Sequence, residues 1–232
     1  MQRYFSNQKK DNFLILNKSD IYHIKTVMRM KQNDLVEVVY QNKLYICRLN
    51  QNYVAVIEKI EDQKLDAKCK IVLCLPLLQE QKMSFILQKA TELGVNEIIP
   101  IYTERSIIKI DGKEDKKIER WNKICKEASE QSKRLDIPLI RQVTKISDLD
   151  FEGLKILCST KEKKNTIKKV LKKSNKYDTI IMVVGPEGGL ALNEEKVLTD
   201  LGFIPTTLGN NIMRVETVPI YLLSVLNYEF ME

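Results

Sequence analysis

Histidine is nearly absent from this chain, since His23 is the only one among 232 residues. A Ser-His-Asp triad or a multi-histidine metal site therefore has almost nothing to be built from, unless His23 itself serves as a base. The five cysteines are odd in number, scattered and free of C-x-x-C spacing, which supports neither a disulfide framework nor a zinc site. We expect reduced, buried thiols and no metal.

Long apolar runs are lacking as well. No stretch of about 18 apolar residues occurs, and the N-terminal residues show neither the apolar core nor the small-residue cleavage site of a signal peptide. Hydrophobic residues make up 44% of the chain, as in globular proteins. We therefore expect a cytoplasmic protein of one or two domains, with no membrane partner.

Acidic residues are in the minority. The chain carries 38 Lys and Arg against 31 Asp and Glu, and its pI is about 9.0, which favours a polyanionic partner. The densest basic block is "KEKKNTIKKVLKKSNK", residues 161–176. Helical spacing places Ile167, Val170 and Leu171 toward a core, so the lysines of this block are better explained as a solvated helix face than as a specific RNA contact.

The first part of the chain predicts a small β-rich barrel domain over residues 1–69. Apolar residues at helical spacing in 20–31 indicate a short helix that Ser19 or Asp20 caps. Three following segments alternate apolar and polar residues between polar turns, which is typical of antiparallel hairpins with one wet face. These predicted strands are 35–40, 44–49 and 53–60.

Residues 70–232 show a different rhythm, in which short apolar strands alternate with amphipathic helices. This order predicts an α/β domain with a mostly parallel sheet covered by helices. Gly94 and Gly202 follow two of the helices, where a left-handed residue commonly ends a helix. The predicted strands are 71–75, 97–101, 154–158 and 180–184, and the predicted helices are 80–93, 115–132 and 193–201.

The last segment, 218–230, reads as a helix with Pro219 in its first turn and with apolar residues nearly all round. A helix without a polar face must be covered on both sides. Its own sheet supplies one cover, and we expect a second subunit to supply the other. The sequence therefore predicts a homodimer through helix 218–230.

The segment "VVGPEGGLALNEE", residues 183–195, joins a predicted strand to a predicted helix through a glycine-rich turn. Its spacing matches neither a dinucleotide fingerprint nor a P-loop. The glycines allow close backbone approach and Pro186 fixes a bend. Glu187 places a carboxylate at the carboxyl end of a strand, where open α/β sheets bind ligands. Taken alone, the turn fits a ligand site and a plain tight connection equally well.

A second candidate site is "TTLGNNIMRVET", residues 206–217. Leu208 and Gly209 break the chain where backbone groups could line a pocket. Arg214 and Glu216 project to the same side if the segment is extended. Such a pair is by default a surface salt bridge worth little.

Six motifs occur in order along nearly the whole chain, and together they resemble the SPOUT superfamily of methyltransferases. They are "HIKTVMRMKQND", "LQKATELGV", "ERS", "IERWNKICKEASEQSKR", "VVGPEGG" and "LGNNIMRVET". More narrowly, they are similar to the bacterial enzymes that methylate N3 of a uridine in the decoding region of 16S ribosomal RNA.

The resemblance implies an α/β protein with an N-terminal PUA-like, OB-related barrel for RNA and a C-terminal SPOUT domain with a trefoil knot, a rare exception to unthreaded chains. It implies an obligate dimer with the active site at the subunit interface, acting on 16S rRNA or the assembled small subunit. It also implies S-adenosylmethionine held mainly by backbone at three loops. The matching positions are Ser159, Gly185, Pro186, Glu187, Gly188, Leu208, Gly209, Asn211, Ile212 and Met213.

For catalysis, the resemblance points to Arg214 for stabilising the uridine anion or orienting a flipped base. Glu216 could hold Arg214, and Thr217 could bond a substrate edge, while no residue stands out as the general base. The expected RNA-binding residues are Arg3, His23, Arg29, Arg105 and Arg134, although His23 fits equally well as a core residue of its short helix.

Three residues depart from the family pattern. Asn210 and Asn211 stand where relatives tend to carry Pro-Arg, and Val218 stands where alanine is usual. Two other functions stay open: a SPOUT methyltransferase for a tRNA base or a ribose 2′-hydroxyl, and a non-catalytic RNA-binding protein of ribosome assembly. A uridine C5-methyltransferase is less favoured, because its covalent route needs a positioned thiolate.

Overall fold

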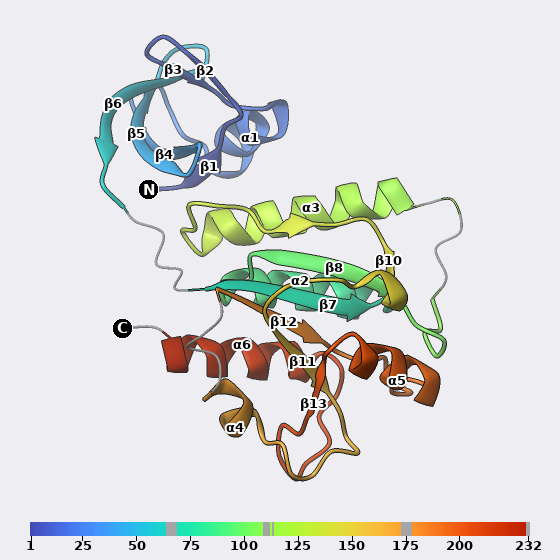
Figure 1. Ribbon diagram of the computed structural model, residues 1–232. Coiled ribbons are helices and arrows are strands. Elements are labelled where there is room, and N and C mark those ends of the chain that lie inside the picture. Colours follow the sequence, from blue (N-terminus) through green and yellow to red (C-terminus); the bar gives the residue numbers. More distant parts are fainter. Residues whose placement is uncertain (64–68, 109–111, 113, 173–177, 231–232) are drawn as a thin grey trace. The chain divides into compact units, whose positions relative to one another are not determined.

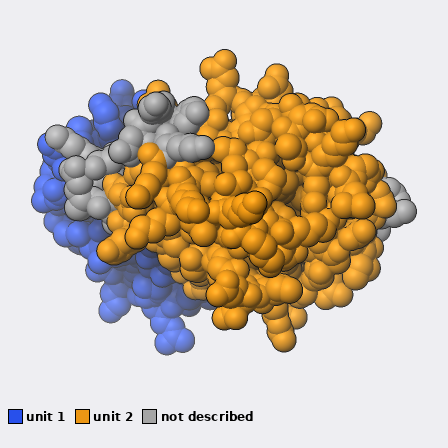
Figure 2. Space-filling view, turned by 60° about the horizontal axis from the view of Figure 1, so that its bottom comes forward, with its two compact units in different colours: residues 1–66, 126–137 blue, residues 67–125, 138–232 orange. Residues whose placement is uncertain are grey.

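The computed structural model describes residues 1–63, 69–108, 112, 114–172 and 178–230. Its chain folds into mixed helices and sheets (Figure 1). Two compact units are distinguished in Figure 2: one comprises Met1–Asp66 and Lys126–Ile137, and the other comprises Ala67–Cys125 and Pro138–Glu232.

The first unit is built on a curled six-stranded sheet in the order β1-β4-β5-β6-β3-β2 (Figure 1). Only β1 and β4 pair in parallel. The three predicted strands are confirmed to within two residues, and positive φ angles at Gln41 (49°) and Asn42 (58°) make the tight turn between β4 and β5. The strands are β1 (Arg3–Phe5), β2 (Gln8–Lys10), β3 (Phe13–Ile15), β4 (Leu35–Tyr40), β5 (Lys43–Leu49) and β6 (Ala55–Glu61).

The helix expected over 20–31 is shorter and less regular. It consists of α1 (Lys18–Tyr22) and a π-helical turn η1 (His23–Val27). The predicted cap is wrong, because the side chain of Asn17 caps the helix by accepting from the backbone N–H of Asp20 at 2.8 Å. The wider π turn breaks the 3.6-residue period, so that Ile24 is buried while Val27 is 59% exposed.

Residues 126–137 group with the barrel unit through their contacts, although they are distant from it in sequence. Leu135 packs against Val39 and Leu44 of the barrel. The ammonium of Lys126 bonds Asp20, 106 positions away in the sequence. Side-chain contacts over such a distance leave no trace in sequence periodicity.

Lys126 also pairs with Glu130 at 2.8 Å, and this buried cluster makes stability depend on pH. Burial raises the pKa of Glu130 to about 7, against the attraction of Lys126. The folded chain then binds more protons than the unfolded chain, so the free energy of unfolding falls as pH rises from about 5 to about 7.

Glu130→Gln removes this titration. We expect the free energy of unfolding of the variant, taken relative to wild type, to be higher at pH 8 than at pH 5 by on the order of 2 kcal/mol. Urea denaturation at the two pH values measures it. The exposed Glu119 on the same helix provides the control, since Glu119→Gln should track wild type at both pH values. A pH-independent difference for Glu130→Gln would contradict the prediction.

The second unit contains a seven-stranded sheet in the order β10-β8-β7-β12-β11-β13, with β9 beside β8. Every described pairing in it is parallel, as predicted. The predicted strands and helices are confirmed to within one or two residues, while β9, β10 and β13 were not predicted. The strands are β7 (Lys70–Pro76), β8 (Glu97–Tyr102), β9 (Leu139–Ile140), β10 (Thr144–Lys145), β11 (Leu154–Cys158), β12 (Thr179–Val183) and β13 (Ile204–Thr206).

Helices flank this sheet (Figure 1). Gly94 and Gly202 end two of them with φ angles of 88° and 87°, which confirms the predicted stops. The core-facing side predicted for the basic block is confirmed in α4, whose apolar residues are buried; residues 173–177 of that block lie outside the described part. The helices are α2 (Glu80–Glu92), α3 (Glu114–Gln131), α4 (Ile167–Leu171), α5 (Leu192–Asp200), α6 (Thr217–Phe230) and the 3-10 turn η2 (Ile146–Asp148).

The last helix, α6, buries one face within its own unit. Leu222, Leu223 and Leu226 are inaccessible, and the amide of Asn227 donates to the carbonyl of Leu93 at 3.1 Å. Tyr228 on the other side is 88% exposed. A second subunit as its cover stays a prediction. None of the helices in the described residues has the length and apolar character that a membrane crossing requires.

Candidate functional site

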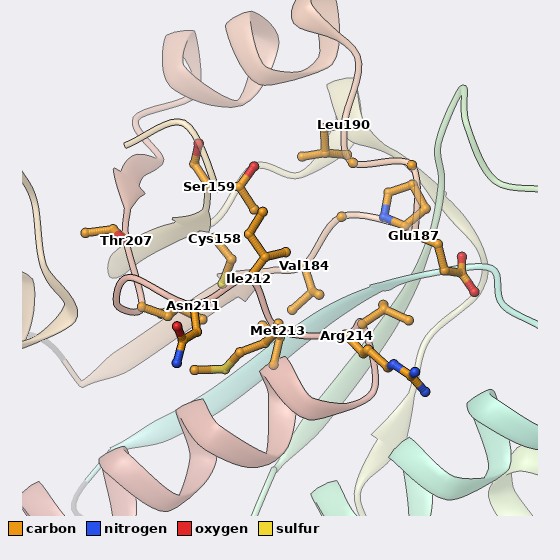
Figure 3. Close-up of a pocket in the computed structure, with 18 of the residues that line it drawn as sticks. Cys158, Ser159, Val184, Glu187, Leu190, Thr207, Asn211, Ile212, Met213 and Arg214 are labelled. Atoms are coloured by element: carbon orange, nitrogen blue, oxygen red, sulfur yellow. The ribbon is translucent and has the colours of Figure 1, made fainter. Parts of the chain in front are cut away.

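A pocket of about 620 Å³ lies at the carboxyl ends of the adjacent strands β12, β11 and β13 (Figure 3). This volume is in the range of small-molecule sites. In the sheet, β8 lies on one side of β7 and β12 lies on its other side, so the strand order reverses at β7. Open α/β sheets bind ligands beside such a reversal, at the carboxyl ends of the strands.

The turn of residues 185–189, called the GPEGG turn below, forms one wall. The N–H of Gly189 donates to the carbonyl of Pro186 at 2.8 Å, and Gly189 has a φ of 70°. A Cβ at Gly185 would lie 3.2 Å from the backbone nitrogen of Leu190. A side chain at Gly185 would therefore crowd the main chain of Leu190.

The other walls are loops tied to one another by backbone bonds. The N–H of Ser159 donates to the carbonyl of Thr206 at 3.0 Å, and the N–H of Thr207 donates to the carbonyl of Asn165 at 2.9 Å. Ser159, Thr207 and Asn211 lie on one side of the pocket, and Glu187 and Arg214 lie on the opposite side (Figure 3). The walls of the pocket are thus loops held together by main-chain bonds, and their lining includes three carboxylates and three cations.

All ten predicted cofactor-binding residues line this pocket, as do Arg214 and Glu216. Thr217 does not line it; as the first residue of α6 it donates its N–H to the carbonyl of Arg214 at 2.9 Å. The structure brings these residues together, and their individual roles stay predictions. Lining residues that the sequence analysis missed include Lys82, Lys163 and Glu195.

Arg214 and Glu216 do not lie in an extended segment, so the condition for their projecting to the same side is not met. The chain turns there, because the carbonyl of Arg214 accepts from Thr217 and, at 3.3 Å, from Val218. Among the described interactions, no ion pair joins Arg214 to Glu216, so Glu216 does not hold the guanidinium. Oε2 of Glu216 is buried and accepts no hydrogen bond in the described structure.

The ion pair at this wall is formed by two other residues. Nζ of Lys82 lies 2.8 Å from Oε1 of Glu187. Burial acts to raise the pKa of Glu187, but the hydrogen bond and charge of Lys82 outweigh it and lower that pKa. The bond with Glu187 in turn raises the pKa of Lys82. Both groups therefore stay charged around neutral pH.

Two of the arginines expected to bind RNA have structural partners instead. Arg3 is 3% exposed; its guanidinium pairs with Glu37 at 2.8 Å and donates to the carbonyls of Lys133 and Arg134. We therefore withdraw Arg3 as an RNA contact. The side chain of Arg134 is largely buried and pairs with Asp136 at 2.9 Å, so it is not available as a free surface charge either.

The remaining expected RNA-binding residues are more accessible. His23 is half-buried, with Nδ1 3.0 Å from the hydroxyl of Tyr4. Arg29 is exposed and has a φ of 52°. Arg105 is exposed and donates from Nη1 to the carbonyl of Gly188 at 3.0 Å. Of the five residues expected to bind RNA, Arg29 and Arg105 are thus the two that are exposed and positively charged.

Cys158 is the one cysteine among the pocket's lining residues. Burial raises the pKa of its thiol to about 12, so it is not a thiolate at neutral pH. Cys47, Cys74 and Cys125 are buried, and Cys69 and Cys158 are partly buried. Within the described residues, no group of His, Cys, Asp or Glu is arranged to hold a metal ion.

Comparisons with known proteins agree with this architecture. Residues 65–227 match the family model described as an RNA methyltransferase domain. A protein of Mesomycoplasma hyopneumoniae named ribosomal RNA small subunit methyltransferase E is 40% identical over 97% of this chain and 98% of its own length. A protein of the same name from Bacillus subtilis is 33% identical over 99% and 97%.

Solved structures give the same result. A ribosomal RNA small subunit methyltransferase E from Neisseria gonorrhoeae, bound to S-adenosyl methionine, superposes with a TM-score of 0.88 at 25% identity and covers 99% of this chain and 98% of its own. A putative methyltransferase from Legionella pneumophila in complex with the same cofactor gives 0.87 at 27% identity, over 98% and 97%. The chain therefore belongs to the RNA methyltransferase family, together with the relatives named ribosomal RNA small subunit methyltransferase E.

Proposed function

We propose that this chain uses S-adenosylmethionine to methylate small-subunit ribosomal RNA, and more narrowly N3 of a uridine in the decoding region of 16S rRNA. The observation that carries the proposal is the pocket that three loops form at the ends of β12, β11 and β13. The relatives that share the fold supply the reaction class and the cofactor. The uridine specificity rests on the resemblance of the motifs.

The residues of the pocket fit such a cofactor. S-adenosylmethionine carries no phosphate, and the GPEGG turn lacks the Lys-Ser or Lys-Thr of a phosphate loop. Apolar side chains such as Leu190, Ile212 and Met213 line the pocket beside the main chain, which suits a purine and a thioether. Three carboxylates and three cations line the pocket, so its charged groups balance and an uncharged purine and thioether can be held by the apolar side chains and the loops.

When bound, the cofactor supplies a methyl group on a sulfonium. The chain's contribution is to orient both reactants and to place charge. Arg214 would stabilise the uridine anion left when N3 loses its proton to water. The bound cofactor would supply its methyl group to N3 and would keep the electron pair of the sulfur–carbon bond, so the transfer balances. The neutral thiol of Cys158 offers no nucleophile for a C5 route.

We further propose a PUA-like barrel for RNA in residues 1–69, a knotted SPOUT domain in 70–232 and a cytoplasmic homodimer through α6. The curled sheet of the first unit supports the barrel. The exposed Tyr228 and the partly exposed Ile220, Tyr221 and Val225 on the otherwise apolar α6 support the dimer. Light scattering behind gel filtration should give twice 27.0 kDa; a monomeric mass would contradict the dimer.

Ligand-dependent unfolding tests the cofactor assignment. S-adenosylmethionine at 100 times its dissociation constant should stabilise the folded protein by about 2.7 kcal/mol, visible as a rise in Tm. ATP at the same concentration serves as the control and should leave Tm unchanged, because the site has no phosphate loop. No shift with S-adenosylmethionine, in the presence or absence of RNA, would favour a non-catalytic RNA-binding protein.

A further inference from the structure

We propose that Lys82 is a positioning residue of the cofactor site: with Arg105, it holds the GPEGG turn in its binding shape before any ligand arrives. The idea deepens the proposed function and rests on it for the ligand's identity. The immobilisation of the turn itself is a property of the ligand-free chain and can be measured separately.

The ion pair between Lys82 and Glu187 connects two elements that are 105 positions apart in sequence. Lys82 lies in the first turn of α2, which follows β7, and Glu187 lies in the turn that follows β12. These strands are neighbours in the sheet, with Val183 paired to Cys74 at their carboxyl ends. The pair therefore bridges the place where the chain reverses direction across the sheet, at the edge of the pocket.

A second element fixes the same turn from the end of β8. Arg105 donates to the carbonyl of Gly188 at 3.0 Å, and a Cβ at Gly188 would lie 3.5 Å from Cβ of Arg105. The neighbouring N–H of Glu104 donates to Oε1 of Glu194 at 2.7 Å. Residues 187–194 are thus bonded at three points to α2 and to the loop after β8.

The composition of the turn explains why such bonds matter. Gly188 and Gly189 are exposed, and glycine loses more conformational freedom on ordering than any other residue. A main-chain site binds well only if its amides and carbonyls are already in place, because ordering them on binding reduces affinity. Side-chain bonds from rigid elements supply that order in advance.

The alternative role for Lys82 is a direct contact with substrate. Its ammonium is within electrostatic reach of Glu216 and Arg214, the two ionisable residues at the proposed substrate side. The two roles predict different kinetics. A positioning residue changes the affinity for S-adenosylmethionine, whereas a substrate contact changes kcat and leaves that affinity intact.

The experiment compares Lys82→Met, which keeps the aliphatic stem, with Lys82→Arg, which keeps the charge. Lys89→Met is the matched control, because Lys89 lies on the same helix and forms an ion pair of the same length, 2.8 Å, with Glu92 outside the pocket. Calorimetry measures the dissociation constant of S-adenosylmethionine. Hydrogen exchange of residues 185–191 in the ligand-free protein measures the order of the turn.

We expect Lys82→Met to weaken cofactor binding about two- to fivefold, within the reach of one partly exposed ion pair, and to speed exchange of the turn several-fold. Lys82→Arg should restore both, and Lys89→Met should match wild type. Unchanged hydrogen exchange in Lys82→Met would overturn the inference, whether or not the wild type bound S-adenosylmethionine. Failure of the wild type to bind S-adenosylmethionine would instead count against the proposed function. Faster exchange with an unchanged dissociation constant would also overturn the inference.

Discussion

Replacing Arg214 by alanine should lower kcat for methyl transfer to small-subunit RNA by about 100- to 1000-fold, the usual loss when one group that stabilises a developing anion is removed. Arg214 lies at one side of the pocket with an exposed guanidinium (Figure 3), and no ion pair with Glu216 engages it among the described residues. The dissociation constant of S-adenosylmethionine should stay within about threefold of wild type, because main chain forms the proposed cofactor walls.

Single-turnover transfer of a labelled methyl group, with calorimetry alongside, measures both quantities. Arg120→Ala is the control, since Arg120 is a 60% exposed arginine of α3 that pairs with Glu80 outside the pocket. Its kcat should match wild type. If Arg214→Ala loses cofactor affinity and turnover together, the assignment of Arg214 to the substrate side is wrong.

Replacing Gly153 by alanine should destabilise the second unit by at least about 3 kcal/mol, through strain at a φ that L-residues avoid and through a clash. Gly153 has a φ of 136° and precedes β11, and an added Cβ would lie 2.4 Å from the carbonyl oxygen of Thr179 in β12. That oxygen belongs to the backbone of a paired strand, so it cannot move without disturbing the sheet that carries the pocket.

Gly202→Ala separates strain from clash in this test. Gly202 also has a positive φ, 87°, but the nearest atom to an added Cβ is the flexible Lys155 side chain at 4.0 Å. Its loss should be limited to about 1–2 kcal/mol of left-handed strain. Urea denaturation gives both values. Equal losses in the two variants would show that the contact with Thr179 adds nothing.

Local patterns predicted the regular elements of both units well. β7 and β12 are continuous apolar runs, and α2 and α5 end at glycines that adopt the expected positive φ. The two glycine-containing loops were also found, and the structure gathers them in one pocket. These features depend on residues close in sequence, where period and turn chemistry carry the information.

The features that the sequence could not predict are contacts between residues that are far apart along the chain. Nothing in the segment "LPLLQEQKMSF" marks Lys82 as the partner of Glu187. Likewise, nothing near Arg3 in the sequence reveals that its guanidinium pairs with Glu37 and donates to two carbonyls that follow α3. An arginine looks the same in a sequence whether it is buried or free. The turn at Arg214 was missed for a related reason, because its bonds are made by the start of α6.

Methylation of N3 of a uridine in small-subunit ribosomal RNA is the activity that we propose for this chain. The most direct test incubates the purified protein and S-adenosylmethionine with small subunits from a strain that lacks the gene, followed by nuclease digestion and mass spectrometry of the nucleosides. We expect 3-methyluridine at a single position of 16S rRNA, formed by wild type and strongly reduced with Arg214→Ala. A ribose-methylated nucleoside, or no methylated product from either the subunits or naked 16S rRNA, would contradict it.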